Sequence, residues 1–128
     1  MEKQQEINEI LKLSVGSEEA VTLKPAKVKI VEVKVEELGT KKSHKVVCVC
    51  KHPAKDETIS LSSLKYENKG KLEVSGLWVN KDSIGMIRKG SALAVMLQRL
   101  NCANISELKG KEVETLLDDK GYLAFKGY

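Results

Sequence analysis

The apolar side chains of residues 21–38 change faces partway along the segment, and this change restricts the folds open to the chain. The apolar residues lie at even positions and then at odd positions: Ala26, Val28 and Ile30, followed by Val31, Val33 and Val35. Successive side chains of a strand point to opposite faces, so this switch requires a bulge or a sharp bend. A first strand bent in this way can serve two sheets of a small barrel.

A second switch of the same kind occurs in residues 58–66. Ile59 and Leu61 lie on one face, whereas Leu64 and Tyr66 follow on the other, with Ser62-Ser63 between them. The sequence therefore predicts that the third strand also bends. A valine-rich second strand, His44–Lys51, lies between the two bent strands, and Pro53–Asp56 supplies the turn.

The second half of the chain predicts a hairpin, a helix and a final hairpin. Residues 71–88 are interpreted as an added hairpin with its turn at 80–82. Leu93, Met96, Leu97 and Leu100 have helical spacing behind the N-cap Ser91, which predicts a helix over 91–100. After a helical turn near 106–108, strands are expected at 112–117 and 122–125, joined by the turn 118–121.

This order predicts a mainly β protein with one or two helices. It resembles the order of a small antiparallel Greek-key barrel of the OB type, in which a helix precedes the final hairpin. We assign residues 17–128 to this OB-like domain. Residues 1–16 carry Ile7, Ile10 and Leu11 at helical spacing, which predicts an amphipathic helix in front of it.

Composition excludes several other classes of protein. A length of 128 residues suits one domain. The longest apolar run, residues 92–97, is far shorter than the roughly 20 residues of a membrane span. The N-terminus lacks the pattern of a signal peptide, and the three cysteines have no disulfide-framework spacing. We therefore expect a cytoplasmic protein that is not bound to a membrane.

His44, Cys48, Cys50 and His52 are candidate metal ligands that share one strand face. A strand rises about 3.3 Å per residue, so the two histidines would lie roughly 26 Å apart, too far to share one ion. We expect the two cysteines to be small buried residues, with no bound metal or cofactor. No histidine lies in a recognisable nucleophile motif, and no glycine-rich phosphate loop is present. The sequence therefore indicates a protein that is not an enzyme.

Positive charge is concentrated in residues 21–71, which hold twelve lysines against six acidic residues. The second and third strands of an OB barrel, with the neighbouring loops, hold oligonucleotides. Lysines would bind the phosphates, and aromatic rings would stack on the bases. The predicted nucleic-acid-binding residues are Lys41, Lys42, Lys45, Lys51, Lys65, Tyr66, Lys71 and Trp78.

This pattern favours sequence-tolerant binding of single-stranded DNA or RNA. Only Arg88 and Arg99 are arginines, and arginine is the residue that forms bidentate contacts with guanine. Three alternatives stay open. A solvated lysine face, as in lysine-rich thermophilic proteins, explains the charge equally well. The acidic Asp118-Asp119 turn would also repel the phosphates of a nucleic acid. The chain can also be a protein-interaction module or a homo-oligomer, using an open strand edge.

Overall fold

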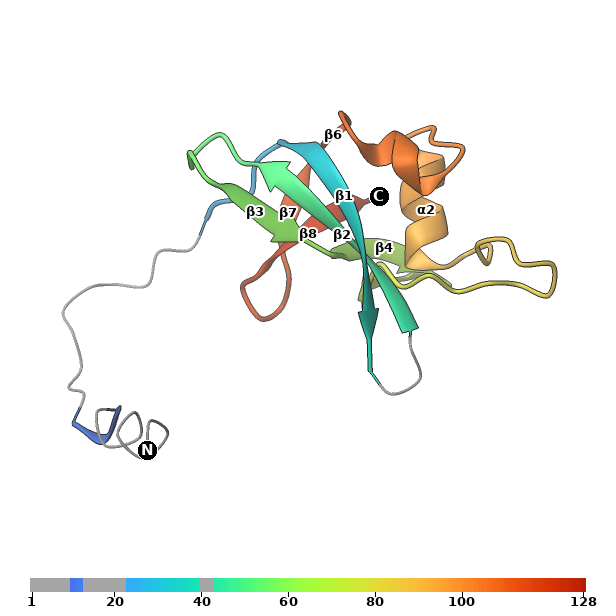
Figure 1. Ribbon diagram of the computed structural model, residues 1–128, viewed down its shortest axis with the longest axis horizontal. Helices are drawn as coiled ribbons and strands as arrows, with labels where there is room; N and C mark the ends of the chain where they lie inside the picture. The colour runs from blue at the N-terminus through green and yellow to red at the C-terminus, as the bar shows by residue number, and fades with distance from the viewer. Residues whose placement is uncertain (1–9, 13–22, 40–42) are drawn as a thin grey trace.

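The computed structural model describes residues 10–12, 23–39 and 43–128, which form a mainly β structure with one α-helix in the folded body (Figure 1). The strands are β1 (Val28–Leu38), β2 (Ser43–Lys51), β3 (Thr58–Leu61), β4 (Ser63–Asn68), β5 (Lys71–Gly76), β6 (Glu112–Val113), β7 (Thr115–Leu117) and β8 (Leu123–Gly127). The helix α2 spans Ala92–Arg99, and a 3₁₀ turn spans Ile105–Leu108.

The strands form two four-stranded sheets with the orders β3-β2-β1-β6 and β5-β4-β8-β7. Neighbouring strands run antiparallel except β4 and β8, which are parallel. The prediction of an antiparallel barrel therefore holds for the other strand pairs and is wrong for this one. Parallel neighbours need a long connection, and the segment that contains α2 supplies it. Together the sheets form a body consistent with a small β-barrel.

Both predicted bends are confirmed. The register of β1 against β2 shifts between Ile30 and Glu32, so that Val31 is the bulged residue. Ser62 separates β3, in the first sheet, from β4, in the second. Glu114 divides β6 from β7 in the same way, which the sequence did not predict. Residues 58–68 and 112–117 therefore each contribute to both sheets, whereas β1, although bulged, belongs to the first sheet alone.

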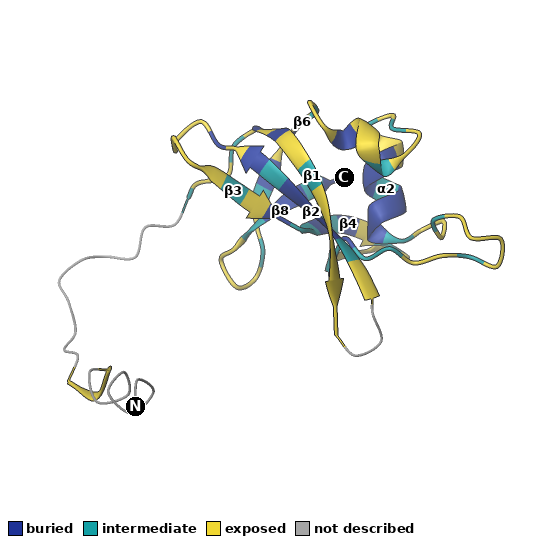
Figure 2. Cartoon of the chain, viewed as in Figure 1, coloured by how far each residue is buried: buried dark blue, intermediate teal, exposed yellow. Residues whose placement is uncertain are grey.

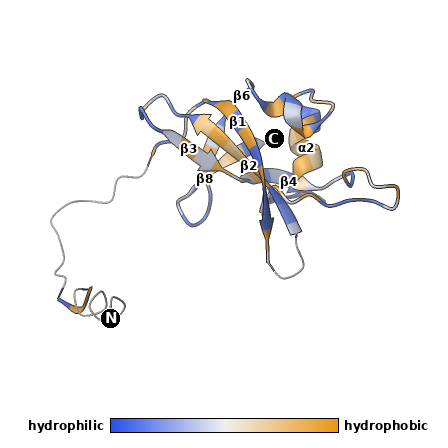
Figure 3. Ribbon diagram, viewed as in Figure 1, coloured by the Kyte–Doolittle hydropathy of each residue, from blue (hydrophilic) through white to orange (hydrophobic). Residues whose placement is uncertain are grey.

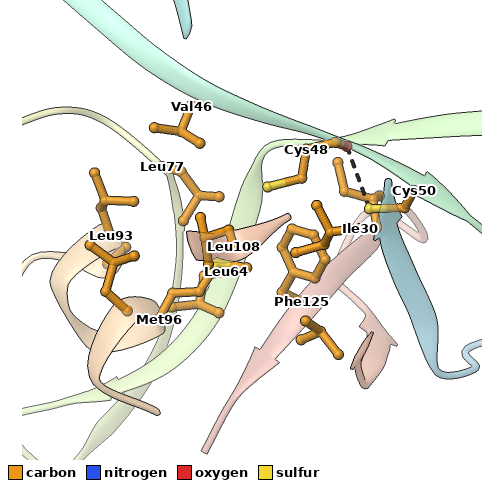
Figure 4. Packing of buried hydrophobic residues seen from close by; sticks show 14 of the residues in the cluster. Ile30, Val46, Cys48, Cys50, Leu64, Leu77, Leu93, Met96, Leu108 and Phe125 are labelled. Atoms are coloured by element: carbon orange, nitrogen blue, oxygen red, sulfur yellow. Dashed lines mark hydrogen bonds between the residues drawn. The ribbon is translucent and has the colours of Figure 1, made fainter. Parts of the chain in front are cut away.

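The core lies between the two sheets and beneath α2 (Figures 2 and 3). Its fully buried side chains come from every layer, as Figure 4 shows for Ile30, Val46, Cys48, Leu64, Leu77, Leu93, Met96 and Phe125. Gly127 lets β8 lie close to β4. A Cβ at this position would stand 2.8 Å from Leu64 Cγ and from the carbonyl oxygen of Lys65.

The predicted helix over 91–100 is confirmed, with bounds one residue shorter at each end. The Ser91 hydroxyl accepts a hydrogen bond from the backbone N–H of Ala94 at 3.3 Å, which is the expected N-cap interaction. The apolar face of the helix packs onto β4 and β8. Because one face of the helix is buried, its leucines and methionine recur at helical spacing. This spacing allowed the helix to be predicted from the sequence.

The expected hairpin over residues 71–88 is wrong. β5 pairs instead with β4, across a turn in which Lys69 and Gly70 have positive φ. A smaller hairpin follows, closed by the bridge between Lys81 and Ile87; we call it the 81–87 hairpin. Its turn forms because the Asp82 carboxylate accepts hydrogen bonds from the backbone N–H groups of Ile84 and Met86. The hydrogen bonds of Asp82 therefore start the turn at residue 82, two residues after the predicted start at residue 80.

Two predicted features fall outside the described residues. The N-terminal helix over 1–16 is described only at residues 10–12, where Ile10 and Leu11 are exposed. Lys41 and Lys42, in the loop before β2, are not described. In the part of the chain that is described, no helix has both the length and the apolar character needed to cross a membrane.

Candidate nucleic-acid interface

The first residues of β2 are flanked by the segment that links β5 to the 81–87 hairpin. The backbone N–H of Val46 donates to the Leu77 carbonyl at 2.8 Å, and that of Val79 donates to the His44 carbonyl at 2.9 Å. Lys45 and Trp78 are consequently paired residues on neighbouring extended segments. Leu77 is fully buried, so the alternation of side chains turns Trp78 to the other face, where it is part-exposed.

Lys45 and Trp78 form a cation–π pair. The Lys45 ammonium lies 5.3 Å from the centroid of the Trp78 ring, within the range in which the ring quadrupole attracts a cation. Gly76 provides the space for both side chains. A Cβ at Gly76 would lie 2.8 Å from Lys45 Cε and 2.8 Å from Trp78 Nε1. The glycine therefore fixes where the indole and the ammonium can lie.

The Trp78 ring borders a hollow of about 500 Å³, which we call the Trp78 hollow. Its lining consists of Ser43, His44, Trp78, Val79, Asn80, Lys81 and Arg88, none of which is acidic. The 81–87 hairpin brings Arg88 into this wall. The Arg88 backbone N–H donates to the Asn80 carbonyl at 2.7 Å, and its Nη2 donates to the Lys81 carbonyl at 3.1 Å.

The cations of the Trp78 hollow are not neutralised by carboxylates. Among the described residues the one salt bridge joins Lys126 to Glu114, with 3.9 Å between Nζ and Oε2. Lys126 also forms the second cation–π pair of the protein, 5.2 Å from the Tyr128 ring. The two lysine–aromatic pairs therefore differ in charge: Glu114 forms a salt bridge with Lys126, whereas Lys45 forms no salt bridge among the described residues, although Glu36 is its register partner on β1.

The structure brings together only part of the predicted site. Lys45 and Trp78 meet, as described above. Lys51 lies at the opposite end of β2, where its ammonium donates to the backbone carbonyl of Asp56 in the turn before β3. Lys65 and Lys71 lie on β4 and β5. These lysines spread over the surface and do not line the Trp78 hollow.

The assignment of Tyr66 to the binding surface is wrong. Its side chain is 7% exposed and belongs to the core cluster. Tyr66 shares the parity of Leu64 on β4, and Leu64 is 1% exposed. Because residues two apart on a strand share a face, the burial of one accompanies the burial of the other. The Tyr66 ring is therefore unavailable for stacking on a base.

Of the residues that line the Trp78 hollow, sequence analysis selected only Trp78 for binding, and the basic residues that it missed are His44, Lys81 and Arg88. One local pattern could have pointed to the last two. Asp82 and Gly85 stand three residues apart, as is favoured at the first and last positions of a type I turn. A reversal there would have brought together the two arms that carry Lys81 and Arg88. His44 carried no comparable pattern.

A second hollow, of about 710 Å³, lies where β3 faces the final hairpin. Its lining is mostly apolar and comprises Leu23, Lys55, Ile59, Leu61, Leu117, Lys120, Gly121, Tyr122 and Leu123. Tyr122 is 69% exposed, the highest value for an aromatic side chain here, and the sequence analysis did not select it. The Asp118 carboxylate accepts hydrogen bonds from the backbone N–H groups of Lys120 and Tyr122. This carboxylate therefore orders the turn beside the hollow.

Two of the four side chains weighed as metal ligands, His52 and Cys50, form hydrogen bonds with backbone groups. The Nε2 atom of His52 lies 2.8 Å from the Lys24 carbonyl oxygen, and its Nδ1 accepts from the Ala54 N–H at 3.0 Å. Cys48 and Cys50 are fully buried, and the Cys50 thiol donates to the Cys48 carbonyl. Within the described ranges no three histidine, cysteine or acidic side chains gather as a metal site would require.

We expect these two thiols to be unreactive in the folded protein. Burial raises the pKa of both Cys48 and Cys50 to about 12, whereas an unperturbed thiol ionises near 9. At pH 8 a disulfide reagent should therefore label Cys102, which is part-exposed, and reach the other two only after unfolding. Because the unfolded thiols ionise first, stability should also fall as the pH rises from about 9 to about 12.

Thiol counting in native and denaturing buffer measures this. The Cys102→Ser variant is the matched control, since its native form should take up almost no reagent. Rapid native labelling of Cys48 or Cys50 would contradict the expectation.

The Lys45–Trp78 pair, the space that Gly76 leaves for it and the turn that carries Arg88 together define the candidate site. Of the predicted binding residues that are described, only Trp78 lines the hollow, and Lys45 joins the site through its contact with the Trp78 ring. Comparison with models of known protein families, with curated proteins and with solved structures finds no match to this chain.

Proposed function

We propose that this protein binds single-stranded nucleic acid, with little preference for sequence, in the Trp78 hollow. The observation that carries the proposal is the part-exposed Trp78 ring, which pairs with Lys45 and lines a hollow together with the cations Lys81 and Arg88. An aromatic ring supplies a stacking surface for any base, and the cations supply contacts for the phosphates. No carboxylate on the lining opposes a polyanion.

The connectivity of the strands supports assignment of the body to the OB type. β1 pairs with β2, β2 with β3, and β3 continues through Ser62 into β4. β4 pairs with β8, β8 with β7, and β7 continues from β6, which returns to β1. This is a circuit of five strands, three of them bent, with α2 between the third and the fourth and with β5 outside the circuit. Barrels of this type hold oligonucleotides on one face.

The residue types in the hollow favour binding that does not depend on the nucleotide sequence. Arg88 is its only arginine, and its guanidinium is already engaged with the Lys81 carbonyl. Lysine acts as a point charge and contacts phosphate without reading base edges. Stacking on an indole accepts all four bases because each base has a π-face. We therefore expect similar affinity for homopolymers of different sequence.

A salt titration tests the proposal. Binding of a labelled single-stranded oligonucleotide should weaken as salt rises, with a log–log slope of about −2 if Lys45, Lys81 and Arg88 each contact one phosphate. Lys45→Ala should lower the affinity and flatten the slope by roughly 0.7, because one counterion fewer is released. Lys126→Ala removes the lysine of the other lysine–aromatic pair and should change neither quantity.

Two outcomes would contradict this. If the protein does not bind the oligonucleotide at low salt, nucleic acid is not its ligand. Equal effects of Lys45→Ala and Lys126→Ala would show general attraction to a positive protein without use of the Trp78 hollow.

A self-assembly module is the second candidate, because β5 is an end strand of its sheet. Two of its apolar side chains are exposed, Leu72 at 49% and Val74 at 40%. An open edge with apolar residues can pair with the same edge of another copy. A molar mass that rises with concentration, and that Val74→Lys returns to the monomer value, would favour this function.

A further inference from the structure

The tip of the 81–87 hairpin exposes two large apolar side chains. Ile84 is 80% exposed and Met86 is 61% exposed, and Ile84 has the highest value of any large hydrophobic residue in the described part of the chain. We call these two side chains the apolar knob. Single exposed apolar residues are common on protein surfaces, so the knob needs evidence beyond its exposure.

The first such evidence is that the backbone holds the knob in place. The Asp82 carboxylate accepts from the N–H groups of Ile84 at 3.0 Å and Met86 at 2.9 Å. The Asp82 N–H donates to the Met86 carbonyl at 2.7 Å, and the Gly85 N–H donates to the Asp82 carbonyl at 3.1 Å. The knob is therefore presented by a turn with four internal hydrogen bonds, which lowers the entropy lost on binding.

The second line of evidence is the position of the hairpin. Its base residues, Asn80, Lys81 and Arg88, belong to the wall of the Trp78 hollow. The Arg88 guanidinium joins the two arms by its bond to the Lys81 carbonyl. Figure 1 shows the segment between β5 and α2 extending away from the body of the molecule. The base of the hairpin consequently belongs to the wall of the hollow and carries two cations, whereas the knob lies beyond the hollow at the tip.

We propose that the apolar knob packs against a base of the bound strand, at a position beyond the Trp78 hollow. This inference rests on the proposed function and adds a second subsite to it. A nucleic-acid strand presents phosphates and flat apolar base faces at short intervals, which matches cations beside an apolar tip. Aliphatic side chains such as isoleucine and methionine insert against bases in this way.

Charge favours this occupant over an apolar protein groove. Lys81, Arg88 and Lys89 flank the knob, and the one carboxylate of the hairpin, Asp82, is occupied by backbone N–H groups. Docking into an uncharged groove of a protein would remove water from these cations without supplying an opposite charge, which costs free energy. A polyanion compensates them.

A binding comparison with two oligonucleotides tests the inference. One is oligothymidylate, and the other is an abasic strand with the same number of phosphates. Ile84→Ser combined with Met86→Ser should weaken binding of oligothymidylate about tenfold, at the low end for the loss of one base contact. Binding of the abasic strand should not change, because the variant keeps every cation.

The control variant is Val35→Ser, which removes an exposed apolar side chain from β1 and should leave both affinities unchanged. Thermal unfolding of all variants should match the wild type, since these side chains are exposed.

The failures are distinguishable. If wild-type protein binds oligothymidylate and the double variant binds it equally well, the knob is not a subsite, although the proposed function stands. If wild-type protein binds neither strand, both proposals fall. If the double variant lowers the molar mass of the free protein, the knob is a contact between copies, and the inference is overturned.

Discussion

Replacement of Phe125 by alanine is expected to lower the free energy of unfolding by about 3–5 kcal/mol. Phe125 is fully buried on β8, opposite Leu64 of β4 on one side and Thr115 of β7 on the other. It also belongs to the core cluster that the first sheet and α2 complete. Truncation would leave a cavity at the position where the layers meet, and well-packed surroundings collapse only in part.

Urea denaturation followed by circular dichroism measures this loss. Tyr122→Ala is the matched control because it also removes an aromatic ring from the final hairpin, but Tyr122 is 69% exposed. Its effect should stay within about 0.5 kcal/mol. Similar losses for the two variants would mean that the core does not depend on β8 as described.

The bends of this fold could be predicted because each leaves a local mark in the sequence. The switch of apolar parity at Val31 and the slip at Ser62 both follow from the alternation of side chains within one strand. The helix was equally local, since its spacing and its Ser91 cap lie within ten residues. A feature that depends only on the residues of one strand or helix can therefore be predicted without knowledge of the rest of the structure.

Pairings between distant segments left no such mark. The parallel contact of β4 with β8 and the bridge of Lys45 with Trp78 join residues far apart in sequence. Nothing in either segment alone specifies its partner or its register. The candidate site therefore could be predicted only in part: the residue types were found, but the wall formed by Lys81 and Arg88 was not.

The error at Tyr66 has a different physical origin. Lysines dominate its neighbourhood in the sequence, and this charge led us to place the ring on the surface. Charge density along a chain does not report which face of a strand is buried. The parity of Leu64 and Tyr66 carried that information, since both follow the slip at Ser62 and both point into the core.

Trp78→Ala is expected to weaken binding of a single-stranded oligonucleotide by about 1–3 kcal/mol, or roughly five- to 150-fold. Loss of the indole removes the stacking surface and also the ring that positions the Lys45 ammonium. Trp78 is the only tryptophan of the chain, so fluorescence quenching of the wild-type protein reports on the same site without a label. Affinity of the variant is then measured by anisotropy of a labelled strand.

Two variants separate stacking from general effects on the surface. Trp78→Phe keeps an aromatic face and should recover most of the affinity, because stacking tolerates a change of ring better than its loss. Tyr128→Ala removes the ring of the other lysine–aromatic pair, whose Lys126 is balanced by Glu114, and should leave binding unchanged. If Trp78→Ala folds and binds the oligonucleotide as tightly as the wild type does, the indole does not stack on bases. The cations of the hollow would then have to bind some other anion.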